Sequence, residues 1–293
     1  MNSKINSNHS FSKTQKALLG GLVGIIVAAG LVIGIIIICN DKPSLNQDAI
    51  IEDQNDEFSG ITIDLDLEAS DVYLREAGNY RLTGKLEHSL IIDAEASDVE
   101  ILLDGVEIPS ADKAAIIGLA AEKIILETAP DSKNILSDGG TSEYDGCIFS
   151  NAELIFAGEG TLTISGNQTE GEGIATEAQD ITFESGTYAI TANDDGINAG
   201  GDGATITFNG GEFYIDASGD GIDSNKDAII NGGTIFVMGS DTGGDAGIDT
   251  DDGFEINGGT VIALGSDMVE SPLASSTQNS FIFTLDETIK EGI

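Results

Sequence analysis

Basic residues are scarce in this chain. Twelve Lys and Arg stand against 51 Asp and Glu, which gives a net charge of −39, and beyond Lys133 only Lys226 and Lys290 are basic. A protein that binds a nucleic-acid backbone needs a basic patch to displace counterions, so nucleic acid is excluded as a partner. The same shortage disfavours docking of the acidic part on an anionic bilayer surface.

Several other residue types are rare. The chain has two His, two Cys, four Pro and no Trp. Two cysteines cannot build a disulfide framework, and so few His and Cys make zinc, copper and iron poor candidates for a bound metal. The 38 glycines follow no collagen period, which suits short strands joined by tight turns. No segment after residue 40 shows a sustained helical period, which predicts an all-β protein.

One long apolar run contrasts with the acidic remainder. Residues 17–39 are 23 residues without a charge, and Lys4, Lys13 and Lys16 precede them. As a helix the run would span about 34 Å, enough to cross a bilayer. The positive-inside rule then predicts a single-pass cell-membrane protein with a cytoplasmic tail at 1–16 and an extracellular C-terminal domain. A cleaved secretory signal is the alternative. The polar residues 40–57 are expected to form a linker.

Two short phrases recur about every 25 residues. The first is Asp-Gly-Ile at 195–197 and 220–222, with weaker echoes at 145–148, 172–174 and 245–248. The second is a Gly-Gly or Ser-Gly pair that precedes a strand-like run. The last glycines of these pairs, at 186, 211, 233 and 259, are 25, 22 and 26 residues apart. A fixed period of this length predicts one structural unit stacked on copies of itself.

Apolar residues recur at matching places in these repeats and alternate with polar ones. One such column comprises Leu162, Tyr188, Phe213, Ile235 and Val261, and another comprises Phe183, Phe208, Ile230 and Ile256. Period-two alternation predicts short strands with one buried face. We therefore expect a parallel β-helix with coils of about 22–26 residues over 111–293, preceded by irregular coils at 58–110. An antiparallel sandwich is the alternative, but it would not need an in-register repeat.

Acidic and amide residues also recur in register at the turns. The expected metal ligands are these side chains: Asp194, Asp195, Asn198, Asp220, Asp223, Asn225, Asp245, Asp249 and Asp251. Stacked carboxylates about 5 Å apart repel one another, and a hard divalent cation relieves that repulsion. Ca²⁺ prefers six to eight such oxygens. The alternative is that these acids are solvated turn residues.

The repeats lack the groups expected of a polysaccharide-cleaving enzyme. They contain no Arg and one Lys, Lys226, whose acidic surroundings disfavour its use as a base. We therefore expect a protein that binds without catalysis. Between the inward columns lies an outward one in which Tyr214, Phe236 and Ile262 would form an apolar stripe suited to sugar rings. The alternative is that a loop or the C-terminal segment covers this stripe.

Taken together, these residues resemble a known family. The segments 78–84, 134–139 and 160–167, with the Asp-Gly-Ile and Asn-Gly-Gly-Thr repeats, are similar to a bacterial cell-surface carbohydrate-binding β-helix family, formerly a domain of unknown function. The resemblance implies a right-handed parallel β-helix, bound Ca²⁺ at Asp195, Asp220 and Asp223, and affinity for cellulose or an acidic plant polysaccharide such as polygalacturonate. The motif departs from the pattern at Ala246.

The resulting hypothesis is a membrane-anchored protein that binds polysaccharide in a calcium-dependent, non-catalytic way. Two alternatives stay open. One is a polysaccharide lyase related to pectate lyases, and the other is a structural adhesin with a protein partner.

Overall fold

The computed structural model describes residues 27–28, 31–32, 45–51, 58–140, 142–266, 268 and 270–284. The chain divides into two units, residues 1–44 and 45–293. In the first unit, Val27–Ala28 (β1) pairs antiparallel with Leu31–Val32 (β2). The expected transmembrane helix at 17–39 is therefore not supported: its four described residues are in strands, and the rest of the run lies outside the described residues. No helix in the described parts of the chain is long and apolar enough to cross a membrane.

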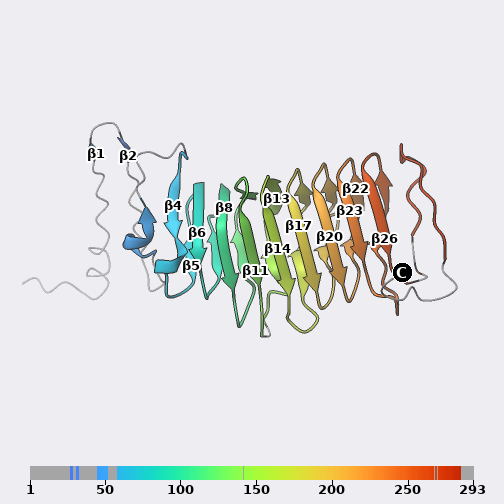
Figure 1. The fold of residues 1–293 in the computed structure, drawn as a ribbon, viewed down its shortest axis with the longest axis horizontal. Helices are drawn as coiled ribbons and strands as arrows, with labels where there is room; N and C mark the ends of the chain where they lie inside the picture. Colours follow the sequence, from blue (N-terminus) through green and yellow to red (C-terminus); the bar gives the residue numbers. More distant parts are fainter. Residues whose placement is uncertain are drawn as a thin grey trace, which may run out of the picture. The chain divides into compact units, whose positions relative to one another are not determined.

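The second unit is a parallel β-solenoid of about seven turns (Figure 1). Each turn supplies strands to three faces, which we name A, B and C. Face A holds β10 (Lys123–Thr128), β13 (Glu153–Gly158), β16 (Ile181–Phe183), β19 (Ile206–Phe208), β22 (Asp227–Ile230) and β25 (Gly253–Ile256). Face B holds β11 (Lys133–Ser137), β14 (Thr161–Gly166), β17 (Thr187–Ala192), β20 (Glu212–Ala217), β23 (Thr234–Met238) and β26 (Thr260–Leu264).

Face C holds β5 (Val72–Leu74), β7 (Leu90–Asp93), β9 (Ile116–Ala120), β12 (Gly146–Ser150), β15 (Glu172–Thr176), β18 (Ile197–Ala199), β21 (Ile222–Ser224) and β24 (Ile248–Thr250). The long strands β6 (Gly78–Lys85) and β8 (Asp98–Pro109) run across faces A and B and join them. All of these strands pair in parallel, so the antiparallel alternative is wrong.

The strand register confirms the coil length expected from the sequence. On face C, partner residues follow one another at Ile148, Ile174, Ile197, Ile222 and Ile248, which are 26, 23, 25 and 26 residues apart. The preceding coil, from Ile116 to Ile148, takes 32 residues and includes the turn around Tyr144. The extra residues of this coil therefore form a loop outside the strands, and the strand pairing on face C continues.

The inward columns fill the core as the sequence predicts. The column Leu162, Tyr188, Phe213, Ile235 is at most 4% exposed, and its members are strand partners in successive coils. The rings of Phe156, Phe183 and Phe208 stack at centroid distances of 4.8 and 5.1 Å. Stacking places like side chains on one another, so burial and ring contact stabilise the same columns.

The N-terminal end of the solenoid is built from antiparallel and irregular elements. Ile50–Ile51 (β3) pairs antiparallel with Ile61–Asp64 (β4), and the 3₁₀ turns η1 (Gln47–Ala49) and η2 (Leu65–Leu67) flank this pair. Ala49 is fully buried. Within the expected linker at 40–57, residues 47–51 form η1 and β3, and residues 40–44 and 52–57 lie outside the described residues. Register shifts between Leu82 and Gly84 and between Ile92 and Asp93 mark the first coils as irregular.

Candidate functional site

Two in-register columns of polar residues lie at the corner between faces B and C. The first column contains Glu172, Asp195 and Asp220, joined by backbone hydrogen bonds from Gly173 N to Asp195 O and from Gly196 N to Asp220 O. The second column contains Asn198, Asp223 and Asp249, which are direct strand partners on the outer side of face C. We call these six residues the carboxylate ladder.

The glycine of each Asp-Gly-Ile phrase is required by the close approach of coils at this corner. A Cβ on Gly196 would lie 2.5 Å from the carbonyl oxygen of Gly221, and one on Gly221 would lie 2.6 Å from that of Gly247. No side chain fits there. The recurring glycine therefore allows the carboxylates on either side of it to stack one coil apart.

Hydrogen bonds tie Asp195, Asn198 and Asp220 to the next coil. One oxygen of Asp195 accepts from the backbone N of Asp220 at 2.7 Å, and the other accepts from Asn198 Nδ2 at 3.0 Å. Asn198 Nδ2 also lies 3.3 Å from Asp223 Oδ2. The backbone N of Ala246 donates to Asp220 Oδ1. These bonds orient the carboxylates, but they do not neutralise them.

Three ladder aspartates are held in an environment that disfavours their charge. Burial, followed by the nearby carboxylates, raises the pKa of Asp220 and of Asp223 to about 7. Burial and Asp194 raise the pKa of Asp195 to about 6, although bonds from Asp220 and Asn198 oppose the shift. Burial also raises the pKa of Asp194, with contributions from other acids that include Asp245. A bound cation would reverse these shifts by favouring the ionised form.

Glu172 was not among the residues predicted as ligands. It is 7% exposed, and its Oε2 has no hydrogen-bond partner within the described part of the chain. Burial, and then Asp145, raises its pKa to about 8. It lines a surface pocket of about 220 Å³ together with Asp145, Phe149 and Asn198. The signal that could have found it was the echo Glu-Gly-Ile, which replaces Asp-Gly-Ile in this coil.

The other predicted ligands are less closely gathered. Ala246, not Asp245, occupies the position opposite Asp220, so Asp245 lies one residue outside the first column. Asp249 Oδ1 accepts from the backbone N of Thr250 at 3.0 Å. Asn225 and Asp251 follow the second column, where their backbone N atoms donate to Ala199 O and Ser224 O. In the ranges that the structure describes, no three His, Cys, Asp or Glu side chains form a ready metal cluster. A cation at the ladder would therefore also need amide or carbonyl oxygens.

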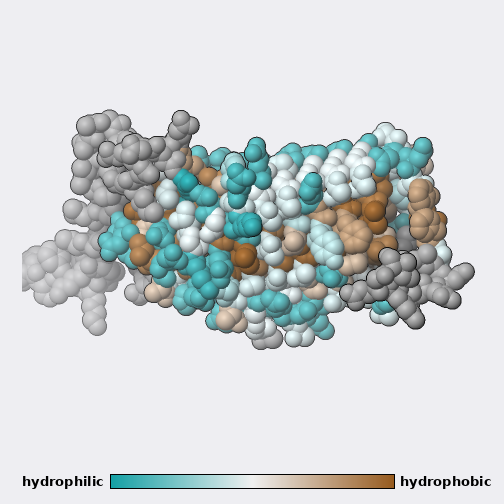
Figure 2. Space-filling model, viewed as in Figure 1, coloured by the Kyte–Doolittle hydropathy of each residue, from teal (hydrophilic) through white to brown (hydrophobic). Residues whose placement is uncertain are grey.

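The predicted apolar stripe lies on the outer side of face B. Tyr214 and Phe236 are strand partners whose rings stack at 5.5 Å with an interplanar angle of 12°. Tyr214 is 48% exposed and Ile262 is 50% exposed, so described residues do not cover the stripe. Figure 2 shows apolar side chains gathered over β20, β23 and β26. The stripe and the carboxylate ladder overlap in two coils, where Tyr214 precedes Asp220 and Asp223, and Phe236 precedes Asp249.

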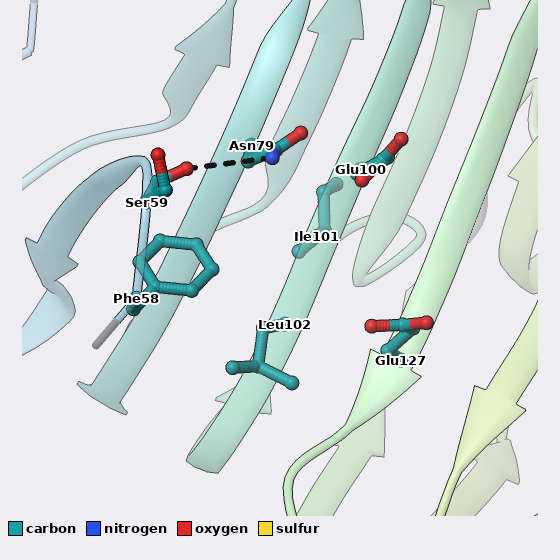
Figure 3. Close-up of a pocket in the computed structure, with 7 residues that line it drawn as sticks. All are labelled: Phe58, Ser59, Asn79, Glu100, Ile101, Leu102 and Glu127. Atoms are coloured by element: carbon teal, nitrogen blue, oxygen red, sulfur yellow. Dashed lines mark hydrogen bonds between the residues drawn. The ribbon is translucent and has the colours of Figure 1, made fainter.

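A second pocket lies on face A near the N-terminal end. It has a volume of about 250 Å³ and is lined by side chains that include Phe58, Asn79, Glu100, Leu102 and Glu127. Figure 3 shows Asn79 donating to the backbone oxygen of Ser59 and the two glutamates on neighbouring strands. No sequence pattern pointed to this pocket, because it combines residues from a non-repeating segment with two coils.

A family model described as carbohydrate-binding domain-containing protein matches residues 68–282. The chain belongs to this family. The match covers both the carboxylate ladder and the apolar stripe, and it confirms the resemblance inferred from the repeats.

Two known proteins are similar to this chain. A carbohydrate-binding domain-containing protein of Acetivibrio thermocellus (strain ATCC 27405) is 28% identical over 149 residues, which are 47% of this chain and 51% of the relative. The chain thus spans about half the length of that relative. The polysaccharide lyase-like protein from C. thermocellum, solved as a gadolinium derivative, aligns with a TM-score of 0.56 and 22% identity over 70% of this chain and 98% of its own. That likeness supports the fold alone.

Proposed function

We propose that this protein binds polysaccharide through the apolar stripe and the carboxylate ladder, with Ca²⁺ as cofactor and without cleaving its ligand. The observation that carries the proposal is the presence, in adjacent coils, of an exposed aromatic stack at Tyr214 and Phe236 and of partly buried carboxylates of raised pKa. The family supports a polysaccharide ligand in general. Cellulose and polygalacturonate are the two candidate polymers.

The apolar stripe suits a chain of sugar rings. Sugar rings pack on aromatic faces, and the outward column repeats once per coil, about 4.8 Å apart. Tyr214, Phe236 and Ile262 therefore offer a row of contacts along the solenoid axis. A polymer lying along this row would contact several coils at once, which favours long chains over single sugars.

The carboxylate ladder fits Ca²⁺ by its donor chemistry. Hard oxygen donors dominate it, and Glu172 contributes a buried carboxylate oxygen without a hydrogen-bond partner in the described chain. Asp195 and Asp223, which share the Asn198 amide between them, would hold the ion, together with the amide oxygen of Asn198 after a side-chain flip and with backbone carbonyl oxygens. When bound, the ion would neutralise these groups and present positive charge to an acidic sugar. An acidic protein would in this way bind an acidic polymer.

The proposal of binding without catalysis rests on the absence of a suitable base in the repeats. Lys226, the single basic residue between Lys133 and the C-terminal stretch, is exposed and lies 4.0 Å from Asp227. The alternative of a lyase keeps one observation in its favour, the raised pKa of Glu172 beside a pocket.

Binding to insoluble cellulose and to immobilised polygalacturonate tests this function. We expect retention on one of the two polymers, release by EDTA, and a loss of about tenfold or more on Tyr214→Ala. Ile135→Ala is the matched control, because Ile135 lies in the same outward column, is also 48% exposed, and belongs to a coil without ladder acids. Equal losses of retention for both variants, or retention that EDTA does not reduce, would contradict the proposal.

A separate assay decides between binder and lyase. Incubation with polygalacturonate and Ca²⁺ at alkaline pH should release no unsaturated uronate, which is detected by its ultraviolet absorbance. Product formation that Glu172→Gln abolishes would establish the lyase instead.

We also propose that residues 17–39 anchor the protein in the cell membrane with the solenoid outside. This rests on the uncharged run and the lysines before it. Retention of the full chain in the membrane fraction, with a solenoid that external protease can reach, is the expected result. Release of the whole protein into the medium would favour a cleaved signal.

A further inference from the structure

Glu172 breaks the hydrogen-bonding pattern of its column. In the two coils that follow, a carboxylate oxygen of Asp195 accepts from the backbone N of Asp220, and one of Asp220 accepts from the backbone N of Ala246. Glu172 takes the same place one coil earlier and is 7% exposed, yet its Oε2 has no hydrogen-bond partner within the described chain. A buried oxygen without a donor is costly, so a ligand group that donates to Glu172 would be bound favourably.

The pocket of about 220 Å³ beside Glu172 spans three coils. Phe149, Ala175 and Asn198 line it from strands β12, β15 and β18, and they are strand partners on the outer side of face C. The partner of Glu172 in the preceding coil is Gly146, which has no side chain that could donate to its carboxylate. The pocket therefore lies where the first column ends, at the boundary between the apolar and the acidic coils.

The walls of this pocket combine negative charge with apolar surface. Asp145 and Glu177 line it and are both exposed, and Glu172 adds a third acid. Phe149 and Ala175 form the apolar part and are 5% and 4% exposed. No Lys, Arg or His is among the described residues that line the pocket. Such a lining favours a ligand that is positively charged and also carries some apolar surface.

A bare metal ion fits this lining less well than an organic cation. Ca²⁺ takes six to eight oxygens at about 2.3–2.6 Å, whereas Phe149 and Ala175 form one wall and offer no side-chain oxygen. Neither Asp195 nor Asp223, the aspartates proposed above to hold Ca²⁺, is among the described residues that line the pocket. An engineered cavity of about 150 Å³ holds a benzene ring, so a volume of about 220 Å³ accommodates a single sugar ring.

We propose that this pocket binds the ammonium group of an amino sugar, such as a deacetylated glucosamine unit, through Glu172. An ammonium N–H donates to Glu172 Oε2 and favours the ionised carboxylate, while Asp145 and Glu177 add attraction from their exposed positions. The apolar side of the sugar ring packs on Phe149, and the net charge of −39 attracts a cationic sugar. The family makes a sugar the expected carrier of the charge. This site needs neither the apolar stripe nor Ca²⁺, so it goes beyond the function proposed above.

Calorimetric titration of the full 293-residue chain with D-glucosamine tests this site. The titration is made in EDTA, which keeps metal from the ladder, and at about 0.15 M salt, which screens nonspecific attraction. We expect saturable binding of D-glucosamine, and binding about tenfold weaker or less for D-glucose and N-acetyl-D-glucosamine, which lack the charge. No binding of D-glucosamine, or equal affinity for either neutral sugar, would overturn the role of the ammonium group. Equal affinity for methylammonium would overturn the role of the sugar ring.

Two variants locate the site. Glu172→Gln keeps the size of the side chain and should weaken D-glucosamine binding by about tenfold or more. Asp145→Asn, at an exposed position, should weaken it about two- to fivefold. Glu122→Gln is the matched control, because Glu122 is exposed, lies just before β10, and loses the same charge. Unchanged binding by folded Glu172→Gln, or an equal loss in Glu122→Gln, would overturn the site. Unchanged binding by Asp145→Asn would do so if Glu172→Gln does not fold.

Tyr214→Ala separates this site from the function proposed on face B. It should leave D-glucosamine binding unchanged, although it should reduce polysaccharide retention. Loss of D-glucosamine binding in Tyr214→Ala would place the sugar on the stripe and overturn the pocket. Failure of retention on both cellulose and polygalacturonate would contradict the proposed function, while the D-glucosamine titration would still decide the pocket.

Discussion

The outer side of face C contains two halves of one column with opposite chemistry. In the coils nearer the N-terminus the column reads Tyr73, Ile91, Ile117, Phe149 and Ala175. In the next three it reads Asn198, Asp223 and Asp249. The strands pair in parallel throughout, so the backbone is equivalent in both halves. Only the side chains that leave the sheet differ.

The first half is a second apolar cluster outside the main core. Ile91, Ile117, Phe149 and Ala175 are at most 5% exposed, and Tyr73, Leu119 and Tyr144 pack against them. The ring of Tyr144 lies 5.2 Å from that of Phe149. Tyr144 belongs to the longest coil, so the extra residues of that coil cover an outer surface which other coils leave open. Burial of this surface stabilises the solenoid.

The second half lies among carboxylates that disfavour one another's charge. Burial and nearby acids raise the pKa of Asp223 in this column and of Asp195 and Asp220 beside it. The inward columns form the packed core in both halves. The outer column can therefore hold side chains that do not add to stability. We infer that the first half stabilises the solenoid and that the second half binds the ligand.

Placing an acidic residue one coil further into the apolar half should have the largest effect on the free energy of unfolding. Ala175 is 4% exposed, lies between Phe149 and Asn198 in the column, and shares a pocket with Glu172. Ala175→Asp should reduce the free energy of unfolding by about 3–5 kcal/mol, because it buries a carboxylate without a cationic partner. Denaturant unfolding at pH 8 measures the loss.

Ala175→Ser is its control, since it adds a polar atom but no charge and should cost about 1 kcal/mol. Equal losses in the two variants would mean that crowding, and not charge, separates the halves.

Removing the ring that covers the apolar half should cost slightly less. Phe149→Ala deletes a side chain that is 5% exposed and should lower the free energy of unfolding by about 3 kcal/mol. Phe149→Leu should cost less than about 1.5 kcal/mol. Both losses should be the same in EDTA and in Ca²⁺, because no ladder carboxylate changes. A loss that Ca²⁺ reverses would show that the two halves are not independent.

The acidic half should give the protein an unusual dependence on pH in EDTA. Asp195, Asp220 and Asp223, with Glu172 one coil before them, have pKa values of about 6 to 8 in the folded chain, above the ordinary values near 4 that apply after unfolding. The folded state therefore binds more protons between pH 5 and 8, and stability falls as pH rises through this window. We expect a loss of about 2 kcal/mol after discounting for the partial exposure of these groups.

Unfolding curves at pH 5 and pH 8 measure this loss. Ca²⁺ should remove most of it by favouring the ionised carboxylates, and the pair Asp220→Asn and Asp223→Asn should remove it without metal. Glu127→Gln, on exposed face A, is the control and should leave the pH dependence unchanged. Stability that stays level from pH 5 to 8 in EDTA would remove the basis for a cation at the ladder.

The sequence predicts the inward columns and the acidic columns for the same physical reason. A coil must repeat its buried side chains to stack, so Tyr188 and Phe213, or Asp223 and Asp249, could be aligned from spacing alone. Where the repeated Asp-Gly-Ile phrase changes, spacing aligns the residues of successive coils less reliably. Glu172 was overlooked because a longer acid replaces Asp in this phrase, and the pocket that it lines with Asp145 is formed between coils. Asp245 was placed in the column although the backbone register gives that place to Ala246.

Features outside the repeat could not be found from the period. The cluster over Phe149 and the pocket at Phe58 each combine a single loop with regular strands, and a single loop leaves no periodic signal. The exposure of the stripe is also a tertiary property. It depends on where residues 270–284 run after the last coil, which the alternation within β20 and β23 does not encode.

Adding one acid inside the second half should have the smallest effect and the clearest dependence on metal. Asn198→Asp removes the two bonds that Nδ2 donates to Asp195 and Asp223 and places a third carboxylate between them. In EDTA at pH 8 it should cost about 1 kcal/mol, because the site is partly exposed and already polar. Calorimetric titration should then show tighter binding of Ca²⁺ than in the unchanged protein, since charge on the ligands increases affinity. The same residue type would thus be strongly destabilising at position 175 and mildly so at 198. Weaker Ca²⁺ binding by Asn198→Asp would instead mean that the amide oxygen of Asn198 is a ligand that a carboxylate cannot replace.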